Sequence, residues 1–225
     1  MDMKKFKHVV LEEAFKDLNT VNKNGQRFYS TPEGHYPSVT TVTGWEKRQF
    51  FAKWRAENPK ESRRVLDRGN KLHNLIEDYI NNRVDDKTTG GLNPFILDLF
   101  ILLKPELDKI DNVYAQEVPL WSSTLELAGR VDCVGEYDGK LSIIDFKGST
   151  RIKRKEDIQN YFMQATAYAI MWQEMTGQKI DNIVILIATE QGESQVFQDN
   201  PIRYVKPLLK SIRDYQEELL INNEI

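Results

Sequence analysis

Two apolar segments joined by a tight turn, with acids inside them, constrain this chain more than any other feature. Residues 127–146 comprise a partly alternating segment, the turn sequence Tyr137-Asp138-Gly139-Lys140 and an apolar segment. This pattern predicts a β-hairpin whose pairing brings Asp132 close to Asp145. Lys147 lies two residues beyond Asp145, so both side chains point to the same face of the strand.

The neighbours of Asp145 indicate that these acids have a function. The run Ile143-Ile144-Asp145-Phe146 is otherwise typical of a buried strand. A buried carboxylate must be paired or bound to a metal ion, and hard divalent cations prefer carboxylate oxygens. The alternative is a solvated hairpin with ordinary surface charges. We favour a site, because a surface hairpin leaves an acid within an apolar run unexplained.

Composition excludes several classes of protein. The 225 residues can bury a full core, and no apolar run approaches the length that spans a bilayer. The first residues show neither the apolar core of a signal peptide nor the composition of a transit peptide. Cys133 is the one cysteine, which excludes an internal disulfide and a cysteine-bound iron–sulfur cluster. We expect a cytoplasmic protein with no membrane partner.

Charge is unevenly distributed along the chain. The net charge is −3, yet residues 46–71 hold nine Lys/Arg against four Asp/Glu. Residues 171–225 hold five Lys/Arg against nine Asp/Glu. The average can therefore hide a basic face that binds nucleic acid, although a solvated helix surface explains the basic stretch equally well.

The order of predicted elements is that of a mixed α/β fold. We expect helices at 8–19, 45–56, 60–82, 94–110, 156–176 and 201–220, a small hairpin at 26–36, an extended segment at 36–42, a loop at 88–93, and strands at 113–121, 125–136, 141–147, 181–188 and 193–198. The helix at 156–176 provides a crossover to a parallel strand. We predict one domain over 1–225, with a mostly helical part (1–110), a catalytic sheet core (111–200) and a C-terminal helix (201–225).

Three further elements contribute candidate site residues. Gly69, His73 and Glu77 share one helix face, where His73 either completes a metal site or simply pairs with Glu77. Gln164 and Tyr168 share another helix face, and they could hydrogen-bond a phosphate or a metal-bound water. Tyr168 could equally be a core residue.

Glu117, on the first strand of the core, either faces the site or is a surface charge.

Phosphodiester cleavage accounts for all these residues. Metal-bound carboxylates activate water, and Lys147 adds a positive donor. Ser149 and Arg151 follow directly and could hold a neighbouring phosphate.

The motifs occur in the order of a known family. Gly69-x-x-x-His73, Gly129-x-x-Asp132, Asp145-Phe146-Lys147 and Gln164-x-x-x-Tyr168 resemble the RecB-type branch of the PD-(D/E)XK nuclease superfamily. Tyr36-Pro37-Ser38-Val39-Thr40 is similar to the subgroup of mitochondrial genome maintenance exonucleases and their phage relatives. The resemblance implies a restriction-endonuclease-like αβββαβ core with an N-terminal helical layer and a C-terminal helix.

The resemblance also implies an activity and roles for the matched residues. The implied activity is Mg²⁺- or Mn²⁺-dependent cleavage of DNA, from single-stranded ends, in replication, recombination or repair. His73, Asp132, Asp145 and the Phe146 carbonyl would bind the metal, and Lys147 would be catalytic. Gln164 and Tyr168 would support the site and contact DNA, Ser38 would touch a phosphate, and Glu117 matches a less constant position.

Two other functions remain open at this stage. One is a structure-selective endonuclease of the same fold, and the other is a catalytically silent DNA-binding module. The lack of four cysteines separates the chain from relatives that hold an iron–sulfur cluster. Without a fused helicase or a mitochondrial presequence, a stand-alone protein from bacteria or a virus-infected host cell is favoured. Cleavage polarity and oligomeric state do not follow from these residues.

Overall fold

The computed structural model describes residues 3–11, 15–85 and 90–221 of the chain. Its centre is a six-stranded mixed sheet in the order β1-β5-β6-β7-β8-β9. The strands are β1 (Lys7–His8), β5 (Ile110–Ser122), β6 (Leu127–Tyr137), β7 (Lys140–Ser149), β8 (Asn182–Thr189) and β9 (Ser194–Asp199). β5, β6 and β7 are an antiparallel meander, while β8 runs parallel to β7. The predicted hairpin and crossover are confirmed, and the hairpin forms the middle of the sheet.

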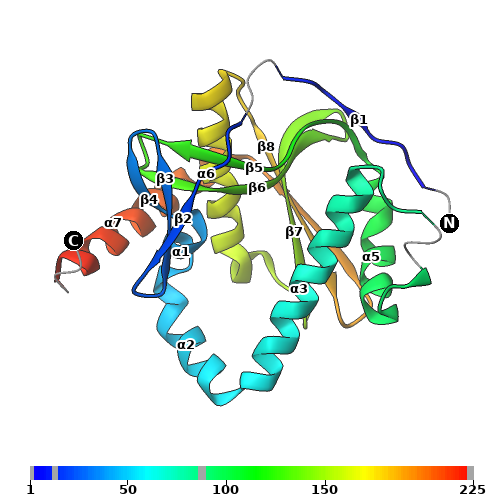
Figure 1. Cartoon of the computed structure of the whole chain (residues 1–225), viewed down its shortest axis with the longest axis horizontal. Helices are drawn as coiled ribbons and strands as arrows, with labels where there is room; N and C mark the ends of the chain where they lie inside the picture. Colours follow the sequence, from blue (N-terminus) through cyan, green and yellow to red (C-terminus); the bar gives the residue numbers. More distant parts are fainter. Residues whose placement is uncertain (1–2, 12–14, 86–89, 222–225) are drawn as a thin grey trace.

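Helices cover both faces of this sheet (Figure 1). One face packs against α6 (Gln159–Thr176), α1 (Val39–Thr43) and α7 (Val205–Ile221). The other face packs against α3 (Pro59–Ile80) and α5 (Pro94–Leu107). β6 and β7 are therefore buried on both sides, which explains their nearly continuous apolar runs. This layered arrangement is the predicted restriction-endonuclease-like α/β fold.

A second, smaller sheet lies in the N-terminal part of the chain. It contains β2 (Thr20–Lys23), β3 (Gln26–Thr31) and β4 (Gly34–Pro37), all antiparallel. The hairpin predicted at 26–36 is confirmed, and β2 is an additional strand. Other elements of the described residues are the 3₁₀ turns η1 (Trp45–Lys47), η2 (Lys155–Ile158) and η3 (Pro201–Tyr204), and the helix α2 (Arg48–Glu57). α2 and α3 meet at Asn58 and form a V, whose α3 arm rises beside β7 (Figure 1).

Three local predictions are wrong. The described residues between 8 and 19 contain no helix. His8 pairs with β5 and Phe15 stacks on Trp172, so the apolar residues of this segment pack on the core without forming a helix. Residues 39–43 are helical rather than extended, since Ser38 caps them. The helix predicted to reach residue 110 ends at 107, where β5 follows closely.

Two further predictions are not decided by the described residues. Part of the predicted loop at 88–93 lies outside the described residues, and the division into one domain with three parts stays a prediction. None of the helices in the described part of the chain is both long and apolar enough to cross a bilayer.

Candidate active site

The central hairpin positions two of the acids. Cys133 and Ile144 are paired across β6 and β7, so Asp132 and Asp145 occupy the next positions along the two strands. The backbone N–H of Phe146 donates a hydrogen bond to Oδ2 of Asp132 over 2.9 Å. This contact joins the ends of the two strands at the point where their regular pairing stops.

Asp145 is almost completely buried, with 1% of its surface exposed. Its Oδ1 accepts a hydrogen bond from Nζ of Lys147 over 2.6 Å. Its Oδ2, however, has no hydrogen-bond partner. A buried carboxylate oxygen without a partner costs stability, so this atom is suited to bind a cation.

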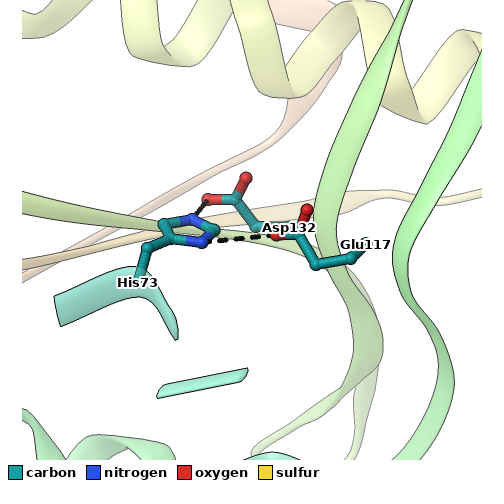
Figure 2. A group of neighbouring side chains, drawn as sticks. All are labelled: His73, Glu117 and Asp132. Carbon is teal, nitrogen blue, oxygen red and sulfur yellow. Dashed lines mark ion pairs between the residues drawn. The ribbon is translucent and has the colours of Figure 1, made fainter. Parts of the chain in front are cut away.

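Three side chains from separate elements, His73, Glu117 and Asp132, converge in one place (Figure 2). His73 of α3 lies with Nε2 2.8 Å from Oδ2 of Asp132 and with Nδ1 3.3 Å from Oε1 of Glu117. One ligand atom from each of His73, Glu117 and Asp132 lies within 4.8 Å of the other two. The histidine therefore lies between two carboxylates, as a metal-ligating group would.

A backbone irregularity directs Glu117 into this group. Gln116 pairs with Cys133 and Val118 with Val131, which puts Glu117 opposite Asp132. The φ angle of Glu117 is 51°, a left-handed conformation that is strained for a non-glycine residue. Arg130 donates a hydrogen bond to the Glu117 carbonyl and helps to hold the distorted strand. Strain of this kind is typical of functional sites.

Burial and mutual repulsion shift the pKa values of the acids. Burial and the charge of Asp132 raise the pKa of Glu117 to about 7. Burial likewise raises the pKa of Asp145 to about 6, with repulsion from Asp132 opposing the stabilising charge of Lys147. Burial also disfavours the charged form of Asp132, but His73 and Lys147 outweigh it and lower its pKa.

The two cationic groups respond in the opposite direction. Burial alone would lower the pKa of His73, yet Asp132 and Glu117 raise it to about 9. Burial also acts against charge on Lys147, but Asp145 and Asp132 together raise its pKa above the ordinary value. Lys147 is thus held protonated in a buried site, where a positive donor acts most strongly.

The residues fit a divalent cation. Oδ2 of Asp145 is buried without a hydrogen-bond partner, and Oε1 of Glu117 is buried with no hydrogen bond beyond its 3.3 Å ion pair with His73. Oxygen ligands with one imidazole suit a hard or borderline divalent metal. Repulsion among the three acids is also relieved when a cation binds between them. The site is therefore a candidate acidic metal centre.

Gln164 and Tyr168 of α6 lie beneath the site. Both are buried, with 7% and 3% of their surfaces exposed, and Gln164 hydrogen-bonds the Tyr168 side chain. A Cβ on Gly129 would lie 2.7 Å from the hydroxyl of Tyr168. Gly129 and Tyr168 therefore belong to one close contact, three residues before Asp132 on the same strand.

Among the other predicted residues, Ser38 and Ser149 make their side-chain hydrogen bonds outside the metal-ligand group, whereas Phe146 joins that group through its backbone. Ser38 is 2% exposed, and its Oγ accepts a hydrogen bond from the backbone N–H of Thr41. Ser149 is buried and donates a hydrogen bond to the carbonyl of Arg151, whereas Arg151 is itself exposed. The ring of Phe146 packs in the core with its centroid 6.0 Å from that of His73. Of these residues, Arg151 is free to reach a ligand in solution.

Two residues near the site had not been selected from the sequence. The Tyr161 ring lies 5.3 Å from Nζ of Lys147, and Tyr161 is three residues before Gln164 on the same helix face. Arg68 is 4% exposed and donates hydrogen bonds to the Gly148 carbonyl, over 3.1 Å, and to Thr150. The sequence signal for Tyr161 is its spacing of three residues from Gln164, and the signal for Arg68 is its spacing of four residues from the buried Leu72.

Comparison with known proteins agrees with this geometry. The sequence profile of the PD-(D/E)XK nuclease superfamily matches residues 70–220, which include His73, the central hairpin and α6. The chain belongs to the PD-(D/E)XK nuclease superfamily. The family resemblance drawn from the motifs is thereby confirmed, and members of this superfamily generally use divalent metals.

Two individual proteins illustrate the similarity. The chain is 28% identical over 148 residues to mitochondrial genome maintenance exonuclease 1 of Mus musculus. That match covers 59% of this chain and 43% of the mouse protein, so it spans less than half of the relative. A crystal structure of a candidate exonuclease from Eubacterium rectale superimposes with a TM-score of 0.49 and 16% identity, over 72% of this chain and 68% of the other.

Proposed function

We propose that this protein is a DNA exonuclease that depends on Mg²⁺ or Mn²⁺ and acts on single-stranded ends. The observation that carries the proposal is the state of Asp145. It is buried at the centre of the sheet, one oxygen is bound by Lys147, and the other has no hydrogen-bond partner. Membership of a nuclease superfamily implies DNA as the substrate.

His73, Asp132, Asp145 and the Phe146 carbonyl would hold the cation, with Glu117 as an adjacent acid. A bound divalent cation lowers the pKa of water and stabilises charge on a reacting phosphate. Lys147 presents a protonated amine, held by Asp145, toward a non-bridging phosphate oxygen. Its half-buried position strengthens that donor when negative charge builds up on the phosphate.

The supporting residues have more specific roles in this proposal. Gln164 and Tyr168 are buried, so they support β6 from beneath instead of contacting DNA broadly. Ser149 orders the turn after β7 through Arg151, and the exposed guanidinium of Arg151 would bind a neighbouring phosphate. Ser38 acts as a helix cap beside β6, with which it forms a bridge at Ala128.

Exonuclease action is favoured over the other reactions of the superfamily because the mouse relative is itself named an exonuclease. A role in DNA replication, recombination or repair follows from that activity. The alternatives predict different products. An endonuclease would cut circular single-stranded DNA, and a silent binding module would cut nothing while still binding DNA.

The test is digestion of end-labelled linear and circular single-stranded DNA with Mg²⁺ or Mn²⁺. We expect wild type to degrade only the linear form, and we expect Asp145→Asn and Lys147→Ala to lose at least about 100-fold in rate. Asp181→Asn is the matched control, because Asp181 is an exposed acid at the start of the neighbouring strand. Equal rates for the site variants and wild type would refute the proposal.

A further inference from the structure

Two adjacent aromatic rings are exposed on α2. Phe50 is 67% exposed and Phe51 45% exposed, and no residue of this helix is buried. Their ring centroids are 5.4 Å apart with an interplanar angle of 75°. Single exposed apolar residues are ordinary, but an adjacent aromatic pair on an unpacked helix leaves a large apolar surface in water. This surface therefore requires a ligand-based explanation.

The pair lies on a cavity that leads to the active site. Phe50 and Phe51 line a cavity of about 390 Å³ together with Tyr161 of α6. The ring of Tyr161 is also 5.3 Å from Nζ of Lys147. One aromatic side chain thus forms part of the cavity wall and contacts the catalytic lysine. Tyr161 therefore separates this cavity from Lys147.

The same cavity carries positive charge. Lys47 and Lys153 line it, and within the described part of the chain neither ammonium group pairs with a carboxylate. Asp157 also lines the cavity, but both of its oxygens bind the Arg154 side chain, over 3.0 and 3.1 Å. Rings beside unpaired cations suit a ligand with flat apolar faces and a negative backbone.

We propose that Phe50 and Phe51 form a base-stacking platform that holds single-stranded DNA while its end lies at Lys147. This inference rests on the proposed nuclease function and specifies where the substrate lies. Stacking on aromatic rings needs unpaired bases, and lysines beside the rings hold the backbone without reading the sequence. A duplex has no base face free for such rings. The platform therefore gives a preference for single strands.

The test compares Phe50→Ala/Phe51→Ala with wild type on a long single-stranded oligonucleotide and on a dinucleotide. We expect KM for the long substrate to rise about tenfold with kcat little changed, because stacking contributes to binding and not to the reaction itself. Cleavage of the dinucleotide should change much less, because it offers the platform at most one base beyond the cleaved bond. Phe95→Ala is the matched control, since Phe95 is 38% exposed on a different helix.

A second readout reports stacking directly. The fluorescent base 2-aminopurine, placed at successive positions from the DNA end, should be quenched at an interior position by the Lys147→Ala variant. The additional Phe50→Ala/Phe51→Ala substitutions should abolish that quenching. The platform alone would be overturned if Phe50→Ala/Phe51→Ala kept the wild-type KM and if the same substitutions left the quenching by Lys147→Ala unchanged. A wild-type protein that cleaves neither substrate would instead overturn the proposed function.

Discussion

At the scale of single residues, two acids of the same sheet, one half-buried and one buried, differ in what their carboxylate oxygens bind. Asp199 at the end of β9 binds Lys155 over 2.6 Å, Tyr204 over 2.8 Å and Arg203 over 3.2 Å. Both of its oxygens are thereby satisfied within the protein. Asp145 has one bound oxygen and one without a partner. Asp199 is a structural acid, and Asp145 has the incomplete coordination of a ligand residue.

A pair of glycines tests the packing beneath the site. A Cβ on Gly129 would lie 2.7 Å from the Tyr168 hydroxyl, whereas a Cβ on Gly69 would meet nothing within 4 Å. We expect Gly129→Ala to lower the free energy of unfolding by about 1–3 kcal/mol, because the strand or the ring must shift. Gly69→Ala should raise it by about 0.5–1 kcal/mol, since alanine favours a helix.

Denaturant unfolding of the two alanine variants measures both effects, and each variant serves as the control for the other. If the two variants were equally stable, the close contact between Gly129 and Tyr168 would be wrong. A lower nuclease rate in Gly129→Ala is expected as well, because Gly129 and Asp132 share β6.

At the scale of elements, the helix that supplies His73 must be held in register with the strand that supplies Lys147. Arg68 joins the two, because α3 carries it and it donates a hydrogen bond to the Gly148 carbonyl of β7. A Cβ on Gly148 would lie 3.3 Å from Nε of Arg68. The absence of a side chain at Gly148 thus permits the close approach of α3.

Arg68→Gln is expected to separate positioning from binding. It should destabilise the protein by about 1–3 kcal/mol, because the buried hydrogen bonds of Arg68 to Glu190 and to the Gly148 carbonyl are lost. It should also lower kcat more than it raises KM, since His73 and Lys147 lose their mutual alignment. Arg64→Gln is the control: Arg64 is 42% exposed and pairs with the same Glu190, so its loss should cost less than about 1 kcal/mol. Similar kcat losses in both variants would argue against a positioning role.

The elements differ in how far the sequence predicted them. The hairpin, the crossover helix and α3 were predicted because their apolar periodicity and turn residues are local signals. The helical α1 was missed because β-branched residues favour strands, while the capping contact of Ser38 decided the outcome. The inward approach of Glu117 depends on a strained backbone that no pattern of side chains signals. The unpaired oxygen of Asp145 likewise appears only when all its neighbours are in place.

At the scale of the whole molecule, the sheet separates two cores and the fold brings oppositely charged parts of the chain together. Arg64 and Arg68 of the basic segment pair with Glu190, and Arg48 pairs with Glu218 of α7. These ion pairs neutralise part of the basic stretch from 46 to 71. Among the residues that the structure describes, Lys47 and Lys153 stay without an ion pair at the cavity beside α2, so positive charge is concentrated there and is not spread evenly along the chain.

The most direct test of the account is anomalous diffraction from crystals soaked in Mn²⁺. We expect a peak within coordination distance of Asp132 and Asp145, beside His73, and we expect Asp145→Asn to lose it. Asp181→Asn crystals should retain the peak, because that exposed acid is paired with Lys179. A Mn²⁺-soaked wild-type crystal with no peak at these residues, from a protein that cleaves DNA, would contradict the proposed metal centre.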